Sequence, residues 1–108
     1  MGGAAPRMTI PSRLLLEALL ADPTRERYGA EIGAEAGLPS GTVHPILARF
    51  EALRWLESRW EDIDPRHEGR PARRYYRLTA DGVEAARSAL ARAYRPTRGL
   101  RPRPVQPT

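Results

Sequence analysis

The sequence contains no cysteine and no lysine, and it has no long run of apolar residues. Without cysteine the chain can form neither a disulfide nor a thiolate metal site, which fits a reducing compartment. No segment approaches the roughly 20 apolar residues of a membrane span, and the first residues, MGGAAPRM, lack the hydrophobic region of a signal peptide. We therefore expect a cytoplasmic protein without a membrane segment.

The basic residues are all arginine, 18 of them against 13 acidic residues, and the formal net charge is +5. A lysine-free chain is better explained by a GC-rich coding genome than by a chemical requirement for arginine. Six arginines and no acid follow residue 84, so residues 1 to 84 hold twelve bases with all 13 acids. The folded part is expected to be nearly neutral, and the high isoelectric point alone does not argue for nucleic acid.

The components of an enzyme active site are missing from the sequence. It has no glycine-rich phosphate loop and no paired nucleophile and base, and its two histidines and scattered acids form no metal-binding pattern. A chain of 108 residues builds one small domain, which would enclose a substrate with difficulty. We expect a protein that is not an enzyme and that uses no cofactor or metal.

Residues 39 to 54, PSGTVHPILARFEALR, are the stretch around which the other elements are arranged. Ser40 is suited to cap a helix, and the apolar side chains that follow recur at spacings of three and four: Val43, Ile46, Leu47, Phe50 and Leu53. One side of this helix is therefore expected to be buried. The first turn would expose small polar groups, with Arg49 further along, as suits the approach of a helix N-terminus to phosphates and base edges: Ser40, Gly41, Thr42 and His44.

Three further helices are predicted. The segment from Thr9 to about Ala21 has an unusually wide leucine stripe, which favours packing on the core and also on a second subunit. A short helix over 28–36 ends at Gly37, and the tight turn that follows is typical of a helix-turn-helix. Thr79 can cap a last helix from about Ala80 to Tyr94, with a narrow apolar stripe suited to a close helix contact.

Two strands follow the helix over 39–54. Residues 56 to 63 and 73 to 79 show the two-residue period of strands, and the charged, Pro- and Gly-containing segment between them predicts a turn or extended tip. The pair forms a hairpin, or wing. We expect Trp55 and Trp60 to pack in the core or hairpin, Trp60 on a buried strand face. Four arginines cluster around the tip and favour phosphate contact: Arg66, Arg70, Arg73 and Arg74.

The chain resembles a known family over residues 10 to 94. The Tyr28-Gly29 pair, the SGT run at Ser40 to Thr42 with Pro45, and the GRP tip followed by Tyr76, Leu78, Thr79 and Gly82 are together similar to the PadR-like winged-helix transcriptional regulators, in their short form with one C-terminal helix. The resemblance implies a homodimer, assembled through the first and last helices, that binds a pseudo-palindromic operator and represses transcription.

The resemblance also implies roles for individual residues. Ser40, Thr42 and His44 would contact the major groove and phosphates, and Arg70 would be the contact of the wing. The family usually has tyrosine where His44 stands, so this contact departs from the family pattern. It usually has glycine where Arg54 stands, so the turn into the wing is made without the residue best suited to a left-handed stop.

The predicted fold is therefore α+β: a winged helix-turn-helix with a three-helix core and a two-stranded wing, followed by a C-terminal dimerisation helix. The expected segments are a flexible N-terminus over 1–8, the DNA-binding domain over 9–79, the dimerisation helix over 80–95 and a disordered tail over 96–108. The residues expected to contact DNA are Tyr28, Ser40, Gly41, Thr42, His44, Arg49, Arg66, Arg70, Arg73 and Arg74. Those expected at the dimer interface are Leu15, Leu16, Leu19, Val83, Ala86 and Leu90.

The function predicted is a dimeric, sequence-specific transcriptional regulator of double-stranded DNA, acting as a repressor. The wide leucine face suggests the hypothesis that a small apolar effector binds at the dimer interface. The alternative is a winged helix that contacts another protein and does not read DNA, which the nearly neutral folded part keeps open.

Overall fold

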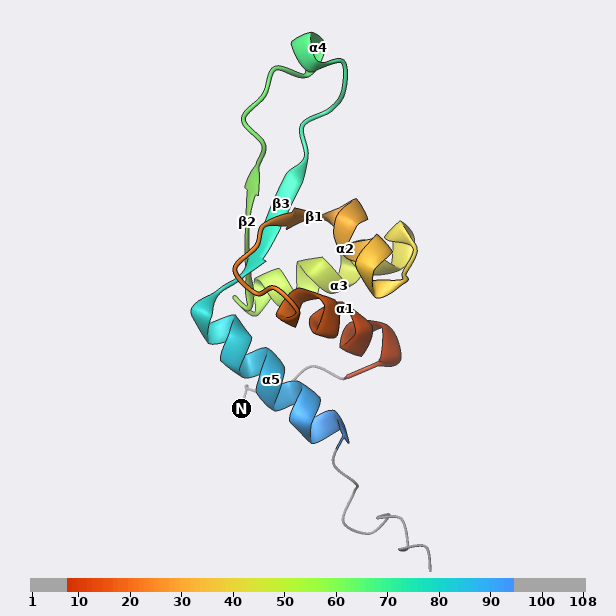
Figure 1. Ribbon diagram of the computed structural model, residues 1–108, viewed down its shortest axis with the longest axis vertical. Helices are drawn as coiled ribbons and strands as arrows, with labels where there is room; N and C mark the ends of the chain where they lie inside the picture. Colours follow the sequence, from red (N-terminus) through yellow and green to blue (C-terminus); the bar gives the residue numbers. More distant parts are fainter. Residues whose placement is uncertain (1–7, 95–108) are drawn as a thin grey trace, which may run out of the picture.

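The computed structural model describes residues 8 to 94. The elements are α1 (Ile10–Leu20), β1 (Arg27–Tyr28), α2 (Gly29–Ala36), α3 (Ser40–Ala52), β2 (Leu56–Trp60), α4 (Pro65–Glu68), β3 (Arg74–Leu78) and α5 (Ala80–Tyr94). Helices α1 to α3 form the body, the β2–β3 hairpin projects from one end, and α5 runs toward the other (Figure 1). This is the α+β winged helix-turn-helix that the sequence predicts.

The hydrophobic core of the body is formed by apolar side chains at the spacings predicted from the sequence. Its buried residues are Leu15, Leu16, Leu19, Ile32, Val43, Ile46, Leu47 and Phe50, and Leu56, Tyr76, Leu78 and Ala86 from the strands and α5 join the same core. Helix α2 ends at Gly37, whose φ of 72° is the left-handed conformation that favours glycine. Only Leu38 and Pro39 separate it from α3, which confirms the tight helix-turn-helix connection.

Two details of α3 differ from the expectation. The N-cap is Pro39, and Ser40 is the first helical residue, so the Ser40 side chain does not cap the helix. Leu53 is 39% exposed although it continues the apolar spacing, because α3 ends at Ala52 and the chain turns away there. The turn passes through Arg54, which adopts a φ of 65° despite being a non-glycine residue.

The sheet has three strands where the sequence predicted two. The order is β1-β3-β2, and both pairs are antiparallel, with Arg27 opposite Tyr76 in the first pair. Strand β1 is only two residues long, too short to show a two-residue period in the sequence. At the tip of the hairpin, the segment expected to be a turn contains the short helix α4.

The predicted burial of Trp60 is wrong, because its side chain is 61% exposed. The hairpin extends beyond the helical body, so no helix covers the end of β2 where Trp60 lies (Figure 1). The ring is instead covered in part by the guanidinium of Arg74, 5.2 Å from its centroid. Trp55 does pack as expected: its ring stacks on that of Phe50, with the centroids 5.2 Å apart.

Arg27 is buried, with only 1% of its surface exposed, although charged residues precede it in the sequence at Arg25 and Glu26. Its guanidinium donates to the main-chain oxygens of Ala18 and Asp22, both at 2.7 Å, and to the Glu35 carboxylate at 3.0 Å. Arg27 therefore caps the C-terminal end of α1 and joins it to α2, while its own backbone pairs with β3.

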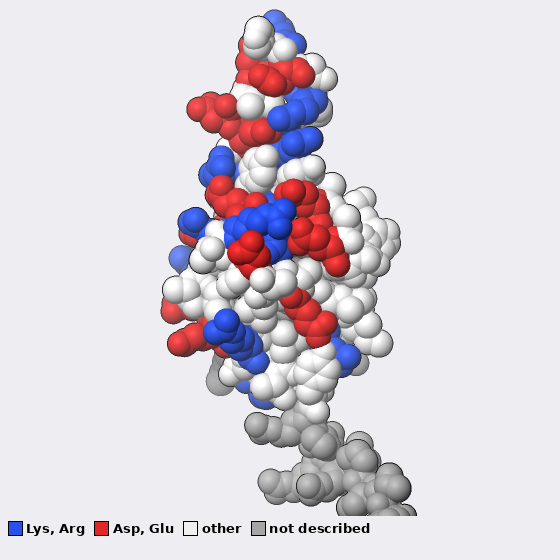
Figure 2. All heavy atoms as spheres, viewed as in Figure 1, with Lys and Arg blue, Asp and Glu red and all other residues white. Residues whose placement is uncertain are grey.

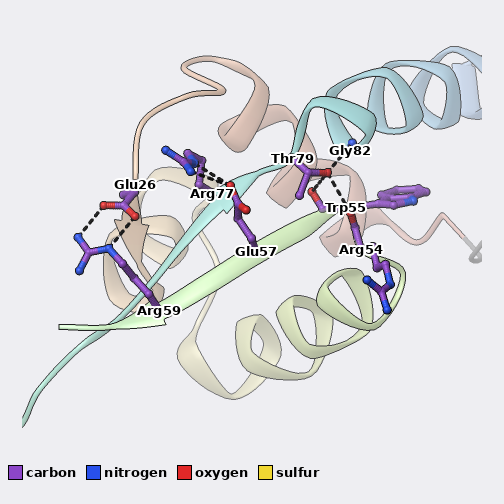
Figure 3. A network of polar contacts seen from close by, with 8 residues as sticks. All are labelled: Glu26, Arg54, Trp55, Glu57, Arg59, Arg77, Thr79 and Gly82. Atoms are coloured by element: carbon purple, nitrogen blue, oxygen red, sulfur yellow. Dashed lines mark hydrogen bonds and ion pairs between the residues drawn. The ribbon is translucent and has the colours of Figure 1, made fainter. Parts of the chain in front are cut away.

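The junction between α3, β2 and α5 is formed around Thr79 and the carbonyl of Trp55 (Figure 3). The Thr79 N–H donates to the Trp55 oxygen at 3.0 Å, and its hydroxyl donates to the Arg54 oxygen at 2.9 Å. The same hydroxyl accepts the N–H of Gly82 at 2.8 Å, which confirms Thr79 as the cap of the last helix. Gly82 is buried directly against the Trp55 backbone.

The expectations of a flexible N-terminus and a disordered tail concern residues 1–8 and 96–108, which lie outside the described residues except for Met8. Residue 95, the end of the expected dimerisation helix, also lies outside them.

We expect Gly82→Ala to destabilise the protein severely, because its Cβ would lie 2.0 Å from the Trp55 carbonyl oxygen and backbone would have to move. The expected loss in the free energy of unfolding is at least about 3 kcal/mol, the upper end of overpacking penalties. The matched control is Gly41→Ala, whose Cβ would have no neighbour within 4 Å. Urea denaturation at one protein concentration checks both variants, and equal midpoints would contradict the close approach.

Candidate nucleic-acid interface

The first turn of α3 is accessible on the side opposite the core. Ser40, Gly41 and His44 are exposed and Thr42 is half-buried, while Val43 between them is fully buried. The apolar spacing of α3 therefore directs its small polar residues outward, as predicted. The N-terminal end of a helix also presents free backbone N–H groups and a partial positive charge, which attract phosphate oxygens.

Tyr28, Gly29, His44 and Arg73 come together where α2, α3 and the wing meet, and we call this group the helix–wing junction. The His44 ring lies against Gly29, where a Cβ would be only 3.1 Å from its Cε1 atom. The Arg73 guanidinium is 4.3 Å from the centroid of the Tyr28 ring, which also packs edge-on against Tyr75. Three of the residues predicted to contact DNA, Tyr28, His44 and Arg73, thus belong to one surface.

Arg49 is positioned differently from the exposed first turn. Its guanidinium donates to the hydroxyl of Ser12 on α1 at 2.9 Å, and it lies 5.9 Å from the centroid of the Phe50 ring. The side chain is therefore engaged in the contact between α3 and α1. The sequence did not indicate this contact with Ser12, and the role of Arg49 in DNA binding stays a prediction.

The four arginines of the wing divide into two kinds. Arg70 and Arg74 are paired with acids: Arg74 lies 3.3 Å from Glu51 and donates to Ser58 at 3.1 Å. Arg73 stacks on Tyr28, and Arg66 makes no ion pair with any residue from 8 to 94. The wing thus carries fewer unneutralised charges than the cluster in the sequence indicated.

Glu61 connects the two sides of the hairpin beyond the last strand pair. Its two carboxylate oxygens accept from the two terminal nitrogens of Arg70 at 2.7 and 2.9 Å. One of these oxygens also accepts the Arg73 N–H at 3.1 Å. The Arg70 hydrogen bonds lower the pKa of Glu61 to about 2; partial burial opposes this shift, and the Arg73 N–H adds to it.

Ion pairs neutralise much of the charge on the described part of the chain. Six arginines are paired with acids: Arg25, Arg27, Arg59, Arg70, Arg74 and Arg77. On the outer face of the sheet these include Glu26 with Arg59 and Glu57 with Arg77 (Figure 3). Figure 2 accordingly shows acidic and basic side chains interleaved along the wing and body on the face it presents.

The residues expected at a dimer interface lie mainly inside the chain's own core. Leu15, Leu16 and Ala86 are fully buried and Leu19 is 2% exposed. Val83 and Leu90 are partly buried and pack against that core. These side chains hold α1, α5 and the body together, and their place at a dimer interface stays a prediction.

Residues 8 to 94 also form a hollow away from the helix–wing junction. An open groove of about 700 Å³ is lined mostly by polar and charged residues: Glu51, Ala52, Arg54, Leu56, Glu57, Ser58, Thr79 and Asp81. Within that range no three histidine, aspartate or glutamate side chains gather as metal ligands. None of the helices described is long and apolar enough to cross a membrane.

The model of the PadR-like family of transcriptional regulators matches residues 16–88, which run from within α1 to within α5 and include the whole helix-turn-helix and the wing. The chain belongs to the PadR-like family. No curated protein sequence matches it. Membership makes the chain a non-enzymatic, DNA-binding transcriptional regulator, as the sequence predicts.

Solved structures agree with this fold. A PadR family regulator from Eggerthella lenta superposes with a TM-score of 0.60 at 24% identity, over 79% of this chain and 75% of that one. The PcaV transcriptional regulator from Streptomyces coelicolor gives 0.61 at 25%, over 81% and 58%. The AbfR protein, in a structure bound to DNA, gives 0.58 at 25%, over 79% and 59%. This PadR-like chain spans little more than half the length of the last two.

We expect the Glu61 carboxylate of this PadR-like protein to stay ionised far below the usual range, with a titration midpoint near pH 2 instead of 4.5. Because the folded-state pKa is lowered, the stabilisation of the wing is complete above about pH 4.5 and is lost as the pH falls through about 2. Carbon-13 NMR of the side-chain carboxyl measures the midpoint directly. In Arg70→Ala the midpoint should rise, and an unchanged midpoint there would contradict the role of the pair.

Proposed function

We propose that this PadR-like chain is a dimeric repressor that reads a pseudo-palindromic operator with the first turn of α3 and with the wing. The observation that carries the proposal is the helix–wing junction, which joins the exposed start of α3 to the hairpin at Arg73, just beyond the last strand pair. In this proposal Ser40, Gly41, Thr42 and His44 contact the major groove and its phosphates. Tyr28 and Arg73 contact the backbone beside them, and Arg66 contacts it at the wing tip.

The proposed mechanism is occlusion of a promoter by two copies of the chain. Two α3 helices related by a two-fold axis would enter successive major grooves about 34 Å apart. The structure of AbfR bound to DNA supports the proposal, because a protein of similar fold binds DNA. Binding would take place in the cytoplasm, where the chromosome is accessible.

We expect the native chain to bind a duplex from upstream of its own gene about a thousandfold more tightly than a scrambled duplex, and to weaken as salt rises. His44→Ala should lose about 1–3 kcal/mol on the specific duplex only, because a base-edge contact is lost. Arg66→Ala should weaken both duplexes, because a phosphate contact is lost. Fluorescence anisotropy at two salt concentrations measures all of these affinities.

The matched control is Arg92→Ala. It removes the same charge from α5, which runs away from the wing (Figure 1), and should leave the affinity within about twofold. If neither duplex binds at moderate salt, or if both bind equally, α3 and the wing do not read DNA. That outcome would favour the alternative function, in which this surface contacts another protein.

The second copy would bind the outward side of α1 beside the end of α5. Ile10 and Leu14 lie one turn apart on α1 and are 66% and 38% exposed. The Tyr94 ring lies on the same side of α1, since the Arg13 guanidinium is 4.6 Å from its centroid and its hydroxyl donates a hydrogen bond to Glu17. These apolar groups, in place of the buried leucines predicted from the sequence, support an interface between two chains.

We expect Leu14→Asp to convert the dimer to a monomer, because it places a charge at the centre of the proposed interface. Leu53→Asp is the matched control: Leu53 is 39% exposed, almost the same as Leu14, but lies at the end of α3. Sedimentation velocity at several concentrations distinguishes the two variants. A dimer that survives Leu14→Asp, or a loss of dimer in both variants, would show that the chains meet elsewhere.

A small apolar effector would have to bind between two copies of the chain. The open groove near α3 and α5 is lined mostly by polar and charged residues. It therefore does not suit an apolar molecule. An effector at the dimer interface would change the separation of the two α3 helices and so the affinity for the operator. Calorimetry with a panel of apolar compounds, in the presence and absence of operator, tests this part of the proposal.

A further inference from the structure

We propose that Glu61 is a positioning residue of the wing, which holds Arg70 within the hairpin and leaves Arg66 and Arg73 as the wing cations that contact DNA. The inference rests on the proposed function and goes beyond it. In the sequence these arginines look equivalent. In the structure Arg66 and Arg73 are available to contact DNA, whereas Arg70 is held by Glu61. It also removes Arg70 from the contacts that the family resemblance implies.

The geometry around Glu61 closes the loop between residues 61 and 73. The Glu61 N–H donates to the Arg73 oxygen at 2.7 Å, and its carboxylate accepts the Arg73 N–H at 3.1 Å. These bonds continue the hairpin past the last strand pair, Trp60 with Arg74. The two terminal nitrogens of Arg70 donate to the two oxygens of the same carboxylate at 2.7 and 2.9 Å. This bidentate pair links the segment before β3 to Glu61.

Arg70 is already committed to partners within the wing. Besides the two bonds to Glu61, it donates to the Pro71 oxygen at 3.3 Å, and its side chain is only 32% exposed. The Glu61 side chain is 15% exposed. To reach a phosphate, Arg70 would have to break the bidentate pair and leave a carboxylate close to the DNA backbone. Such a contact would cost free energy twice, because the charge-assisted pair is lost and the Glu61 carboxylate then repels the phosphates.

Arg66 and Arg73 have no such restraint. Arg66 is exposed on α4 and makes no ion pair with residues 8 to 94. Arg73 rests on the Tyr28 ring, a contact that orients the guanidinium without neutralising it. The Arg70 hydrogen bonds lower the pKa of Glu61, so the carboxylate that holds Arg70 is ionised at neutral pH.

Salt dependence of DNA binding separates the two kinds of arginine. Each phosphate contact contributes about 0.9 to the slope of log K against log salt, so Arg66→Ala and Arg73→Ala should each lower the slope by about that amount. Arg70→Ala should weaken binding without lowering the slope. Glu61→Gln should steepen it by up to about 0.9, because Arg70 is released. A slope lowered by Arg70→Ala and unchanged by Glu61→Gln would overturn the assignment.

Amide hydrogen exchange of the DNA-free protein tests the positioning role separately. Glu61→Ala and Arg70→Ala should speed exchange at the Arg73 N–H by about tenfold or more, because a hydrogen bond to a charged group is lost or loosened. Arg66→Ala should leave it unchanged. If the native chain binds no duplex, the proposed function and the contact assignment both fail, whereas the exchange rates still decide whether Glu61 holds the wing. Equal exchange in all variants would overturn that role.

Discussion

The backbone carbonyl of Trp55 is the point on which the arrangement of α3, the sheet and α5 depends. It accepts the Thr79 N–H, and Gly82 lies so close to it that any side chain would collide with its oxygen. The strands on either side of this contact are paired in register, with Leu56 opposite Leu78. The end of α3 and the start of α5 are therefore held by backbone atoms, which cannot adjust by changing a rotamer.

This rigidity connects the proposed dimer contact with the proposed DNA contact. Helix α5 packs on α1, and both helices carry the exposed apolar groups proposed to meet a second chain. Because α5 is fixed to the end of α3, a shift between two subunits would move each α3 nearly as a rigid body. Arg54 forms the turn in a left-handed conformation, which costs free energy in a non-glycine residue. The hydrogen bond from Thr79 to its carbonyl opposes that cost.

The sequence was sufficient for the elements that repeat a period or carry a specific terminal residue. The apolar spacing located α1, α3 and α5, and Gly37 and Thr79 marked where helices end and begin. It was insufficient where a residue's environment comes from distant segments. Arg27 looks like part of a charged loop, yet Ala18, Asp22 and Glu35 bury it. Strand β1 exists only because β3 pairs with it, and a two-residue strand has no period to detect.

Contacts between distant segments also form the candidate site and determine which of its charges are paired. Tyr28 and His44 lie 16 positions apart, yet the helix-turn-helix connection brings His44 against Gly29, next to Tyr28. The arginine cluster was visible in the sequence, but the acids that pair with Arg70 and Arg74 come from β2's extension and from α3. The sequence gives the number of charged residues, but it does not show which of them form ion pairs. Because Arg70 and Arg74 are paired, the proposed attraction of the wing for DNA rests on Arg66 and Arg73 among its four arginines.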